Sequence, residues 1–233
     1  MDTAELKRRA GERAVDFVTS GMVLGLGHGS TAIFALRRIA RLLDEGELQD
    51  VLGIPTSFQV ERDARELGIP LTTLNEHPEI DLTIDGADEV DDELNLIKGG
   101  GGALVREKIV AQASRREIIV VDETKLSPTL GIQWPVPIAV TPFGWRTQES
   151  FLKSLGARVT LRRGEDGSQF RTDDGNLILD ADFGTVSRVE QLAGHLEERA
   201  GIVEHGLFIR LASDVIVGTP DGTRHIENPL YET

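Results

Sequence analysis

Three short segments of this chain combine glycines with side chains that can transfer protons or hold anions. The first is Gly25-Leu26-Gly27-His28-Gly29-Ser30-Thr31, the second begins at Asp85, and the third runs from Lys98 to Glu107. Glycines let backbone amides approach a ligand closely, while carboxylates and lysines supply proton transfer and positive charge. The three segments together predict a site that binds a small phosphorylated ligand and moves protons on it.

The segment from Gly25 to Thr31 follows an apolar run and precedes a predicted helix. Free amides and the positive end of the helix dipole at such a junction bind phosphate. The same pattern also fits a tight turn with Ser30 as the helix N-cap, and both interpretations stay open. A P-loop would need lysine at Gly29, and a dinucleotide site would need an acid after the second strand, which ends Ile54-Pro55-Thr56-Ser57. Both of these nucleotide motifs are therefore excluded.

An acidic run, Asp85-Gly86-Ala87-Asp88-Glu89-Val90-Asp91-Asp92-Glu93, follows the apolar stretch at 82–84. Its spacing is not that of a calcium loop, and the chain has no cysteine and five scattered histidines, so we expect no metal site. The part from Glu89 to Glu93 is typical of a solvated turn. Asp85 and Asp88 lie where the strand opens, and two carboxylates there can exchange protons with sugar hydroxyls.

The third segment places four consecutive glycines, 99–102, between Lys98 and a predicted amphipathic helix. Linkers seldom lie between a strand and a helix, so a backbone nest around an anionic or polar ligand is the favoured interpretation. Lys98 can stabilise an oxyanion. Glu107 either complements the helix dipole, worth about 0.3–1 kcal/mol, or acts as a general base. A base requires burial to raise a carboxyl pKa that starts at about 4.3, against the effect of the helix terminus.

The elements that must position these groups alternate between strand and helix patterns in the first half of the chain. Apolar runs and helical spacings predict helices at 4–18, 30–43, 58–67 and 103–113, and strands at 22–26, 51–54, 82–84, 94–97 and 117–121. This order predicts an α/β fold with a doubly wound, mostly parallel, Rossmann-like sheet. Ligands on such sheets bind beyond the carboxyl ends of the strands, where all three segments fall. The turn Asp122-Glu123-Thr124-Lys125 follows another strand, so Lys125 either points to the same edge or belongs to a surface turn.

The pattern changes near Gln133-Trp134-Pro135-Val136-Pro137. From there the order strand, helix, two strands, helix, strand predicts a small inserted α+β domain of the ferredoxin-like type. We place this insert at 132–205, as a candidate for subunit contact. The catalytic Rossmann-like domain then comprises 1–131 and 206–233, with a strand at 214–217 rejoining the main sheet.

The chain carries 25 basic and 39 acidic residues, a net charge of −14, which argues against nucleic acid as a partner. A phosphorylated ligand would also be repelled at long range, so its site must be locally positive through backbone amides and a few lysines. No stretch is long and apolar enough to span a membrane, and the N-terminus has no apolar signal segment. We therefore expect a soluble cytoplasmic protein without a membrane partner.

Taken together, the motifs resemble those of ribose-5-phosphate isomerase, type A, and the resemblance runs nearly end to end. It is carried by GHGSTA at 27–32, IPTSFQ at 54–59, DGADEVD at 85–91, KGGGGALVREKIVA at 98–111, DETKLSPTLG at 122–131, PFGWR at 142–146, GNLILD at 175–180, HGLF at 205–208 and DVIVGTPDG at 214–222. One position departs from the family pattern, because His28 stands where the family usually has threonine.

The resemblance implies interconversion of ribose 5-phosphate and ribulose 5-phosphate in the pentose phosphate pathway, without a metal or organic cofactor. In this scheme Glu107 shuttles a proton between C2 and C1 through an enediolate, and Asp85 assists ring opening. Lys98 and Asp88 hold the enediolate oxygens. The substrate-binding residues that it implies are Lys7, His28, Gly29, Ser30, Thr31, Gly86, Ala87, Gly99, Gly100, Gly101 and Lys125. It also implies a homodimer or homotetramer.

Other classes of protein remain as alternatives. A sugar-phosphate sensor would bind without turnover, but such regulators normally carry a DNA-binding helix-turn-helix, for which the strand at 22–26 leaves no room. An amino-sugar-phosphate deaminase would release ammonia from glucosamine 6-phosphate. A CoA transferase would form a covalent glutamyl intermediate. Detection of ammonia or of the covalent intermediate would distinguish these two enzymes from each other and from an isomerase.

Overall fold

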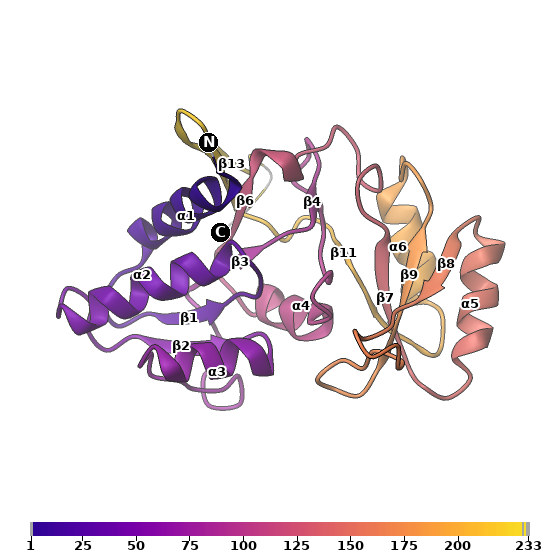
Figure 1. Ribbon diagram of the computed structural model, residues 1–233, viewed down its shortest axis with the longest axis horizontal. Helices are drawn as coiled ribbons and strands as arrows, with labels where there is room; N and C mark the ends of the chain where they lie inside the picture. Colours follow the sequence, from indigo (N-terminus) through magenta and orange to yellow (C-terminus); the bar gives the residue numbers. More distant parts are fainter. Residues whose placement is uncertain (1, 230, 232–233) are drawn as a thin grey trace. The chain divides into compact units, whose positions relative to one another are not determined.

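The computed structural model describes residues 2–229 and 231. The chain divides into two compact units, coloured along the sequence in Figure 1. The first unit comprises Met1–Ala87, Arg106–Lys125 and Arg210–Thr233, and the second comprises Asp88–Val105 and Leu126–Ile209. Within the described residues, no helix is both long and apolar enough to cross a membrane.

The first unit is built on a six-stranded sheet. Its strands are β1 (Val23–Leu26), β2 (Leu52–Pro55), β3 (Leu82–Gly86), β6 (Glu117–Asp122), β12 (Asp214–Thr219) and β13 (Gly222–Glu227), in the order β13-β12-β6-β3-β1-β2. All neighbours pair in parallel except β12 and β13. Strands covered on both faces carry continuous apolar runs, such as residues 118–121 in the fully buried β6. The predicted doubly wound, mostly parallel sheet is confirmed.

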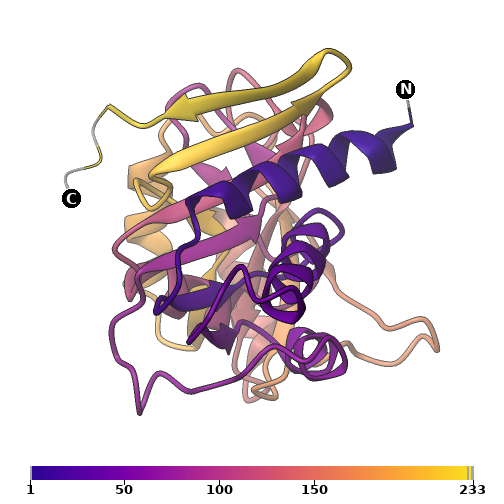
Figure 2. The ribbon, with the colours of Figure 1, turned by 90° about the vertical axis from the view of Figure 1, so that its left-hand side faces the viewer.

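The helices of the first unit are α1 (Thr3–Ala14) with the 3-10 turn η1 (Val15–Phe17), α2 (Ala32–Asp44), α3 (Phe58–Glu66) and most of α4 (Leu104–Gln112). Two of these helices, α1 and α3, begin at a side chain that caps them, Asp2 and Ser57 respectively. Ser57 caps α3 by accepting a hydrogen bond from Val60 N at 3.1 Å. Thr31 occupies the N-cap position of α2, but its hydroxyl accepts no capping hydrogen bond from the first turn of that helix. In Figure 2, α1 lies beside the hairpin of β12 and β13.

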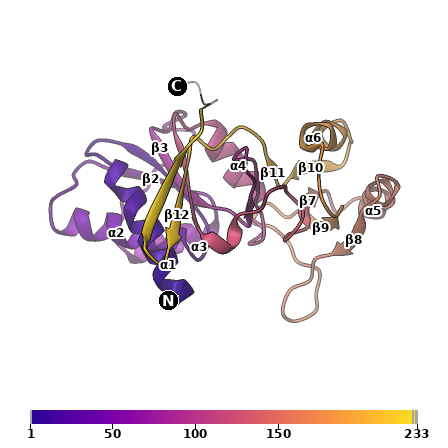
Figure 3. The same ribbon diagram turned by 90° about the horizontal axis from the view of Figure 1, so that it is seen from above.

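The second unit contains a four-stranded antiparallel sheet with two helices (Figure 3). The elements are β7 (Val136–Val140), α5 (Trp145–Ser154), β8 (Arg158–Leu161), β9 (Leu177–Asp182), α6 (Val189–Glu197) and β10 (Ile202–His205). The order strand, helix, two strands, helix, strand is the ferredoxin-like arrangement expected from the sequence. Alternate residues of β7 and β9 face one side and share a core with Leu152 of α5 and Leu196 of α6.

A three-stranded antiparallel sheet also belongs to the second unit. It consists of β4 (Glu89–Val90), β5 (Leu96–Ile97) and β11 (Leu207–Phe208), in the order β11-β5-β4. Because β4 pairs with β5 and β5 pairs with β11, the stretch Asp88–Val105 joins the second unit. The observed division therefore differs from the expected one, which placed 1–131 and 206–233 in one domain and 132–205 in the other.

Glu89 is not part of a solvated turn, as the acidic run suggested, because its side chain is fully buried. Its carboxylate accepts hydrogen bonds from four consecutive backbone amides, those of Gly131, Ile132, Gln133 and Trp134, at 3.0–3.2 Å. Four amide donors replace the water that an ionised carboxylate loses on burial. The acid therefore organises a loop more than 40 residues away in sequence.

Glu89→Ala is expected to lower the free energy of unfolding by about 3 kcal/mol, because four backbone amides lose their acceptor at once. Urea denaturation followed by far-UV circular dichroism measures this change. The matched control is Asp92→Ala, which removes an exposed acid from the same run and is expected to change stability by less than about 0.5 kcal/mol. Equal effects of the two substitutions would contradict the structural role of Glu89.

Candidate active site

The loop after β1 carries the first group of expected substrate-binding residues. It runs against β3, because Gly27 N–H donates to Ile84 O at 3.0 Å and His28 N–H donates to Asp85 Oδ1 at 2.9 Å. A Cβ on Gly27 would lie 2.4 Å from Asp85 Oδ1, so only glycine permits this approach. Gly29 has a φ of 119°, a backbone conformation that favours glycine. The loop and the end of β3 are thus held together by Gly27, which lies in the predicted ligand loop but was not among the expected binding residues.

Asp85 lies at the carboxyl end of β3 and is fully buried. Its Oδ1 accepts hydrogen bonds from the backbone amides of His28 at 2.9 Å and of Gly86 at 2.7 Å. Two fixed amide donors restrict the carboxylate to one position. The structure therefore brings Asp85 together with the loop residues predicted to bind the ligand.

Lys7 and Ser30 meet at the same end of the sheet. Lys7, on α1, donates from Nζ to Ser30 Oγ at 2.9 Å. Ser30 and Thr31 directly precede α2, whose N-terminus contributes amides and a positive dipole end. An ammonium, a hydroxyl and a helix N-terminus are the donors that a phosphate group requires.

His28 has a contact that its sequence position did not predict. Its Nδ1 lies 2.9 Å from Ser57 Oγ, the hydroxyl that also caps α3. His28, Gly29 and Ser30 line a cavity of 260 Å³ together with residues of α2 and α3. The imidazole therefore connects the predicted ligand loop to the start of α3, and Ser57, within the IPTSFQ motif, was the available sequence signal.

Glu107 lies in the first turn of α4, and its residue is 5% exposed. Val110, one turn later on the same side of the helix, packs with Ile54 of β2 and with Ile80. This packing holds the helix against the sheet. The burial that a general base at Glu107 needs is present.

Lys125 belongs to the 3-10 turn η2 (Glu123–Lys125) that follows β6. Since β6 runs parallel to β3, with Gly86 opposite Val120, η2 leaves the sheet at its carboxyl edge. Lys125 is half-buried there. The turn η2 therefore places Lys125 at the carboxyl edge of the sheet.

Asp88 and Lys98 belong to the second unit, where the three-stranded sheet holds their backbones. Asp88 N–H donates to Ile97 O at 2.8 Å, and Lys98 N–H donates to Gly206 O at 2.9 Å. Lys98 is only 1% exposed, and its Nζ lies 5.5 Å from the centre of the Phe208 ring. An ammonium over an aromatic face is stabilised by the ring quadrupole. Lys98 is therefore a buried cation held by its packing.

The glycine run after Lys98 is explained by close contacts within the second unit. Gly100 N–H donates to Asp88 Oδ2 at 2.7 Å, and a Cβ on Gly100 would lie 2.5 Å from Asp88 Oδ1. Gly99 and Gly102 have φ values of 101° and 87°. A Cβ on Gly102 would lie 2.5 Å from the Phe170 ring. The run therefore forms a turn, one of whose amides binds a carboxylate of the protein itself.

The predicted site residues are thus divided between the two units. The first contains Asp85, Glu107 and the substrate-binding candidates Lys7, His28, Gly29, Ser30, Thr31, Gly86, Ala87 and Lys125. The second contains Asp88, Lys98, Gly99, Gly100 and Gly101. Within each unit, hydrogen bonds connect several of these residues, as described above.

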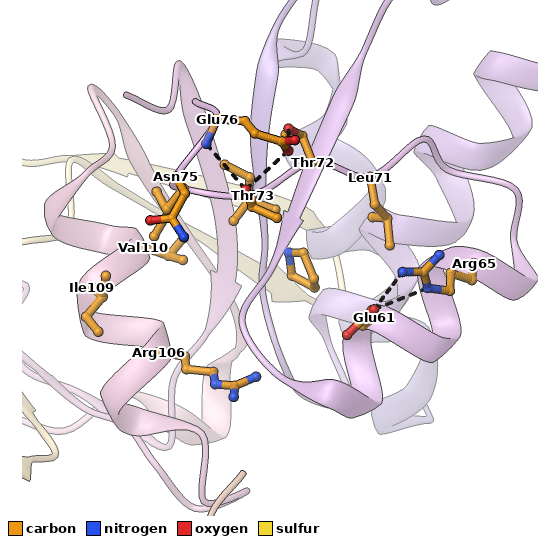
Figure 4. A pocket seen from close by; sticks show the side chains of 13 residues that line it. Glu61, Arg65, Leu71, Thr72, Thr73, Asn75, Glu76, Arg106, Ile109 and Val110 are labelled. Carbon is orange, nitrogen blue, oxygen red and sulfur yellow. Dashed lines mark hydrogen bonds and ion pairs between the residues drawn. The ribbon is translucent and has the colours of Figure 1, made fainter. Parts of the chain in front are cut away.

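A larger cavity, of 570 Å³, lies elsewhere in the first unit (Figure 4). The end of β2, the segment 71–76 and α4 supply most of its lining. Figure 4 shows Glu61 paired with Arg65, and Glu76 bonded to Thr73. Among the residues that the structure describes, those lining this cavity include none of the predicted site residues.

One group of side chains in the first unit has the atoms of a metal site: Asp214, His225 and Glu227 lie with ligand atoms within 4.8 Å of one another. Asp214 already binds a cation, however, because Arg116 donates to both of its oxygens at 2.8 and 2.9 Å. His225 Nε2 lies 2.6 Å from Asp214 Oδ1. An ion-pair network that joins Arg116, the residue before β6, to β12 and β13 explains these contacts.

Asp214→Asn is expected to destabilise the protein by about 2 kcal/mol above pH 5 and by less at lower pH. Burial raises the pKa of Asp214, but hydrogen bonds from Arg116 and His225 outweigh burial, so the pKa lies below its usual value. A carboxyl with a lowered pKa stabilises the fold fully above its unfolded-state pKa of about 3.9 and loses that effect as pH falls through the folded-state pKa. Urea denaturation of both proteins at pH 6 and pH 3 measures the difference. A gap that does not shrink at pH 3 would contradict the ion pair.

Comparison with known proteins places these residues in a family context. The family model described as ribose 5-phosphate isomerase A (phosphoriboisomerase A) matches residues 52–222. The chain is 54% identical to the ribose-5-phosphate isomerase A of Desulfatibacillum aliphaticivorans, over 95% of this chain and 96% of the relative. It is 55% identical to that of Chloroflexus aurantiacus, over 96% and 94% respectively.

Solved structures agree with the sequence relatives. A D-ribose-5-phosphate isomerase in complex with phospho-erythronic acid superposes with a TM-score of 0.95 at 39% identity, covering 97% of this chain and 100% of that one. The ribose 5-phosphate isomerase of Plasmodium falciparum superposes with a TM-score of 0.94 at 41% identity, covering 97% and 99%. Similarity thus extends over nearly the full length of both chains.

Proposed function

The chain belongs to the ribose 5-phosphate isomerase A family, and from this premise we propose that it interconverts D-ribose 5-phosphate and D-ribulose 5-phosphate. The observation that carries the proposal is identity of 54% over 95% of the chain to a relative of that name. The chemistry of the described residues supports it, because the chain holds hydrogen-bond donors suited to a phosphate group, buried carboxylates and a buried lysine.

We propose that the phosphate of the substrate binds at Lys7, Ser30 and Thr31. The Lys7–Ser30 hydrogen bond of 2.9 Å supports this assignment, since it brings an ammonium and a hydroxyl to the N-terminus of α2. Lys125 adds a second positive charge at the carboxyl edge of the sheet. Such local charge acts at short range, where the screened net charge of −14 has little effect. The relative solved with phospho-erythronic acid also binds a phosphorylated ligand.

For the chemical step we propose that Glu107 takes the proton from C2 of the open-chain aldose and returns it to C1, while the proton of the C2 hydroxyl passes to the oxygen of C1. The intermediate is an enediolate, whose negative oxygen Lys98 stabilises with its ammonium. Asp85 assists ring opening by exchanging a hydroxyl proton, and Asp88 holds the hydroxyl next to the enediolate. Gly86, Ala87 and the glycine run 99–101 supply backbone contacts. The burial of Glu107 and Lys98 supports these roles, because charge interactions strengthen away from water.

We further propose that the protein works as a homodimer or homotetramer to which the stretch 132–205 contributes. Three exposed apolar side chains support this surface role: Ile132, Phe143 and Val203, of which Phe143 is 94% exposed. Light scattering after size-exclusion chromatography measures the mass.

The direct test is an assay of the purified wild-type protein with ribose 5-phosphate in buffer containing EDTA. Conversion to ribulose 5-phosphate, followed by NMR, is expected to proceed without added metal. Absence of conversion would overturn the proposal, and so would activity that returns only with a divalent cation. Ammonia from glucosamine 6-phosphate, or a covalent glutamyl adduct with a CoA ester, would instead indicate the deaminase or transferase alternatives.

A further inference from the structure

Arg162, which follows β8, makes an unusually complete set of contacts within the second unit. Its Nη1 donates to Gly99 O at 2.8 Å and to Gly100 O at 2.9 Å. Its Nε donates to Asp180 Oδ2 at 2.9 Å, and its Nη2 donates to the other oxygen of Asp180. Only 15% of the Arg162 side chain is exposed. A two-point pairing with a carboxylate fixes the plane of the guanidinium, which then presents its remaining donor to the two carbonyls.

The first of these carbonyls belongs to the same peptide group as the amide that binds Asp88. Gly99 O accepts from Arg162, while the N–H of that peptide, on Gly100, donates to Asp88 Oδ2 at 2.7 Å. A hydrogen bond accepted by a carbonyl polarises the peptide and strengthens the bond that its N–H donates. The continuous chain of contacts therefore runs from Asp180 through Arg162 and one peptide group to Asp88.

We propose that Arg162 is a positioning residue for Asp88, acting through the Gly99–Gly100 peptide. The inference rests on the proposed function, in which Asp88 holds a substrate oxygen. Arg162 does not touch the substrate in this scheme. It sets the orientation of a peptide group, and that peptide group sets the position of the Asp88 carboxylate.

Two further contacts show that the surroundings of this arrangement are tightly constrained. A Cβ on Gly100 would lie 2.5 Å from Asp88 Oδ1, so the carboxylate reaches the amide only because residue 100 is glycine. The Arg162 guanidinium also lies 5.9 Å from the centre of the Phe170 ring, which itself packs against Gly102. Arg162 and its neighbour therefore hold the glycine run at both ends.

The adjacent residue provides a matched control. Arg163 has the same side chain and is the next residue in the chain, but it is exposed and its Nη1 donates to Gly167 O of a surface turn at 2.7 Å. Arg162→Ala is expected to lower kcat about 30-fold with KM within about threefold, because Asp88 acts mainly on the enediolate, which forms after binding. Arg163→Ala is expected to keep both constants within about twofold. Equal kinetics of the two variants, in an active wild-type background, would overturn the proposal.

Two measurements separate positioning from a general loss of structure. Guanidinium ion at millimolar concentration is expected to restore part of kcat in Arg162→Ala and to leave Arg163→Ala unchanged. In an Asp88→Asn background, Arg162→Ala is expected to lower kcat by less than about threefold, because the residue through which Arg162 acts is already altered. Fully additive losses, or the absence of rescue in a folded variant, would contradict the proposal.

A third measurement does not depend on catalysis. Hydrogen exchange of the Gly100 amide, followed by NMR, is expected to become at least about tenfold faster in Arg162→Ala than in Arg163→Ala, because the bond to Asp88 weakens. Unchanged exchange would refute the coupling between Arg162 and Asp88. If the wild-type protein did not convert ribose 5-phosphate, the proposed function would fail, and this exchange measurement would still decide whether Arg162 positions Asp88.

Discussion

Glu107→Gln is expected to lower kcat by about 10³–10⁴-fold while leaving the affinity for ribose 5-phosphate within about threefold. The carboxamide has nearly the shape of the carboxylate and can occupy the same buried position in α4, but it cannot accept the C2 proton. Steady-state kinetics measures kcat, and isothermal titration calorimetry measures binding. In deuterium oxide the variant is also expected to stop exchanging the C2 proton with solvent.

The matched control is Glu66→Gln, which makes the same change at an exposed glutamate at the end of α3. Its kcat and affinity are expected to stay at the wild-type values. Turnover near the wild-type rate in Glu107→Gln would show that another group transfers the proton. A fall in affinity as large as the fall in kcat would show instead that Glu107 contributes to binding the substrate and not to stabilising the transition state.

Gly27→Ala is expected to lower kcat/KM by about 10²–10³-fold and to destabilise the protein by about 2–3 kcal/mol. The added methyl group would lie 2.3 Å from Asp85 Cα and 2.4 Å from both Ile84 O and Asp85 Oδ1. These neighbours are backbone atoms and a fixed carboxylate, so the loop after β1 must move away from β3. Asp85 then loses the hydrogen bond from the His28 amide, which is 2.9 Å long in the wild-type structure. Kinetics and urea denaturation measure the two effects.

Gly194→Ala is the matched control, because a Cβ at this position in α6 meets nothing within 4 Å. Alanine in the interior of a helix is expected to stabilise the protein by about 0.5–1 kcal/mol and to leave kcat/KM unchanged. If Gly27→Ala behaved like Gly194→Ala, the close approach of the loop to Asp85 would have no bearing on activity.

Much of the fold could be predicted because its signals are local in sequence. The segment 117–121, rich in β-branched residues, predicted β6, which is buried throughout, and the serine at position 57 marks the start of α3. The same local logic placed Glu107 at the beginning of a helix and Asp85 at the end of a strand. Parallel strands share a carboxyl edge, so the predicted ligand residues could be assigned to that edge before any contact was known.

The features that escaped prediction depend on partners distant in the chain. Glu89 has the sequence neighbours of a solvated acid, and only the amides of residues 131–134 make its burial favourable. Arg162 is one of two adjacent arginines, and its contact with Gly99, 63 residues away, distinguishes it from Arg163. The strand β13 consists of partly covered and exposed residues, so it lacked the apolar run that marked the buried strands.

The division of the chain into two units also determines what intrinsic fluorescence can report. Both tryptophans, Trp134 and Trp145, belong to the second unit, and Trp134 donates its backbone amide to Glu89 at 3.1 Å. Tryptophan emission therefore reports on side chains of the second unit. The two tryptophans of the native chain thus provide an intrinsic fluorescence probe for one of its two units.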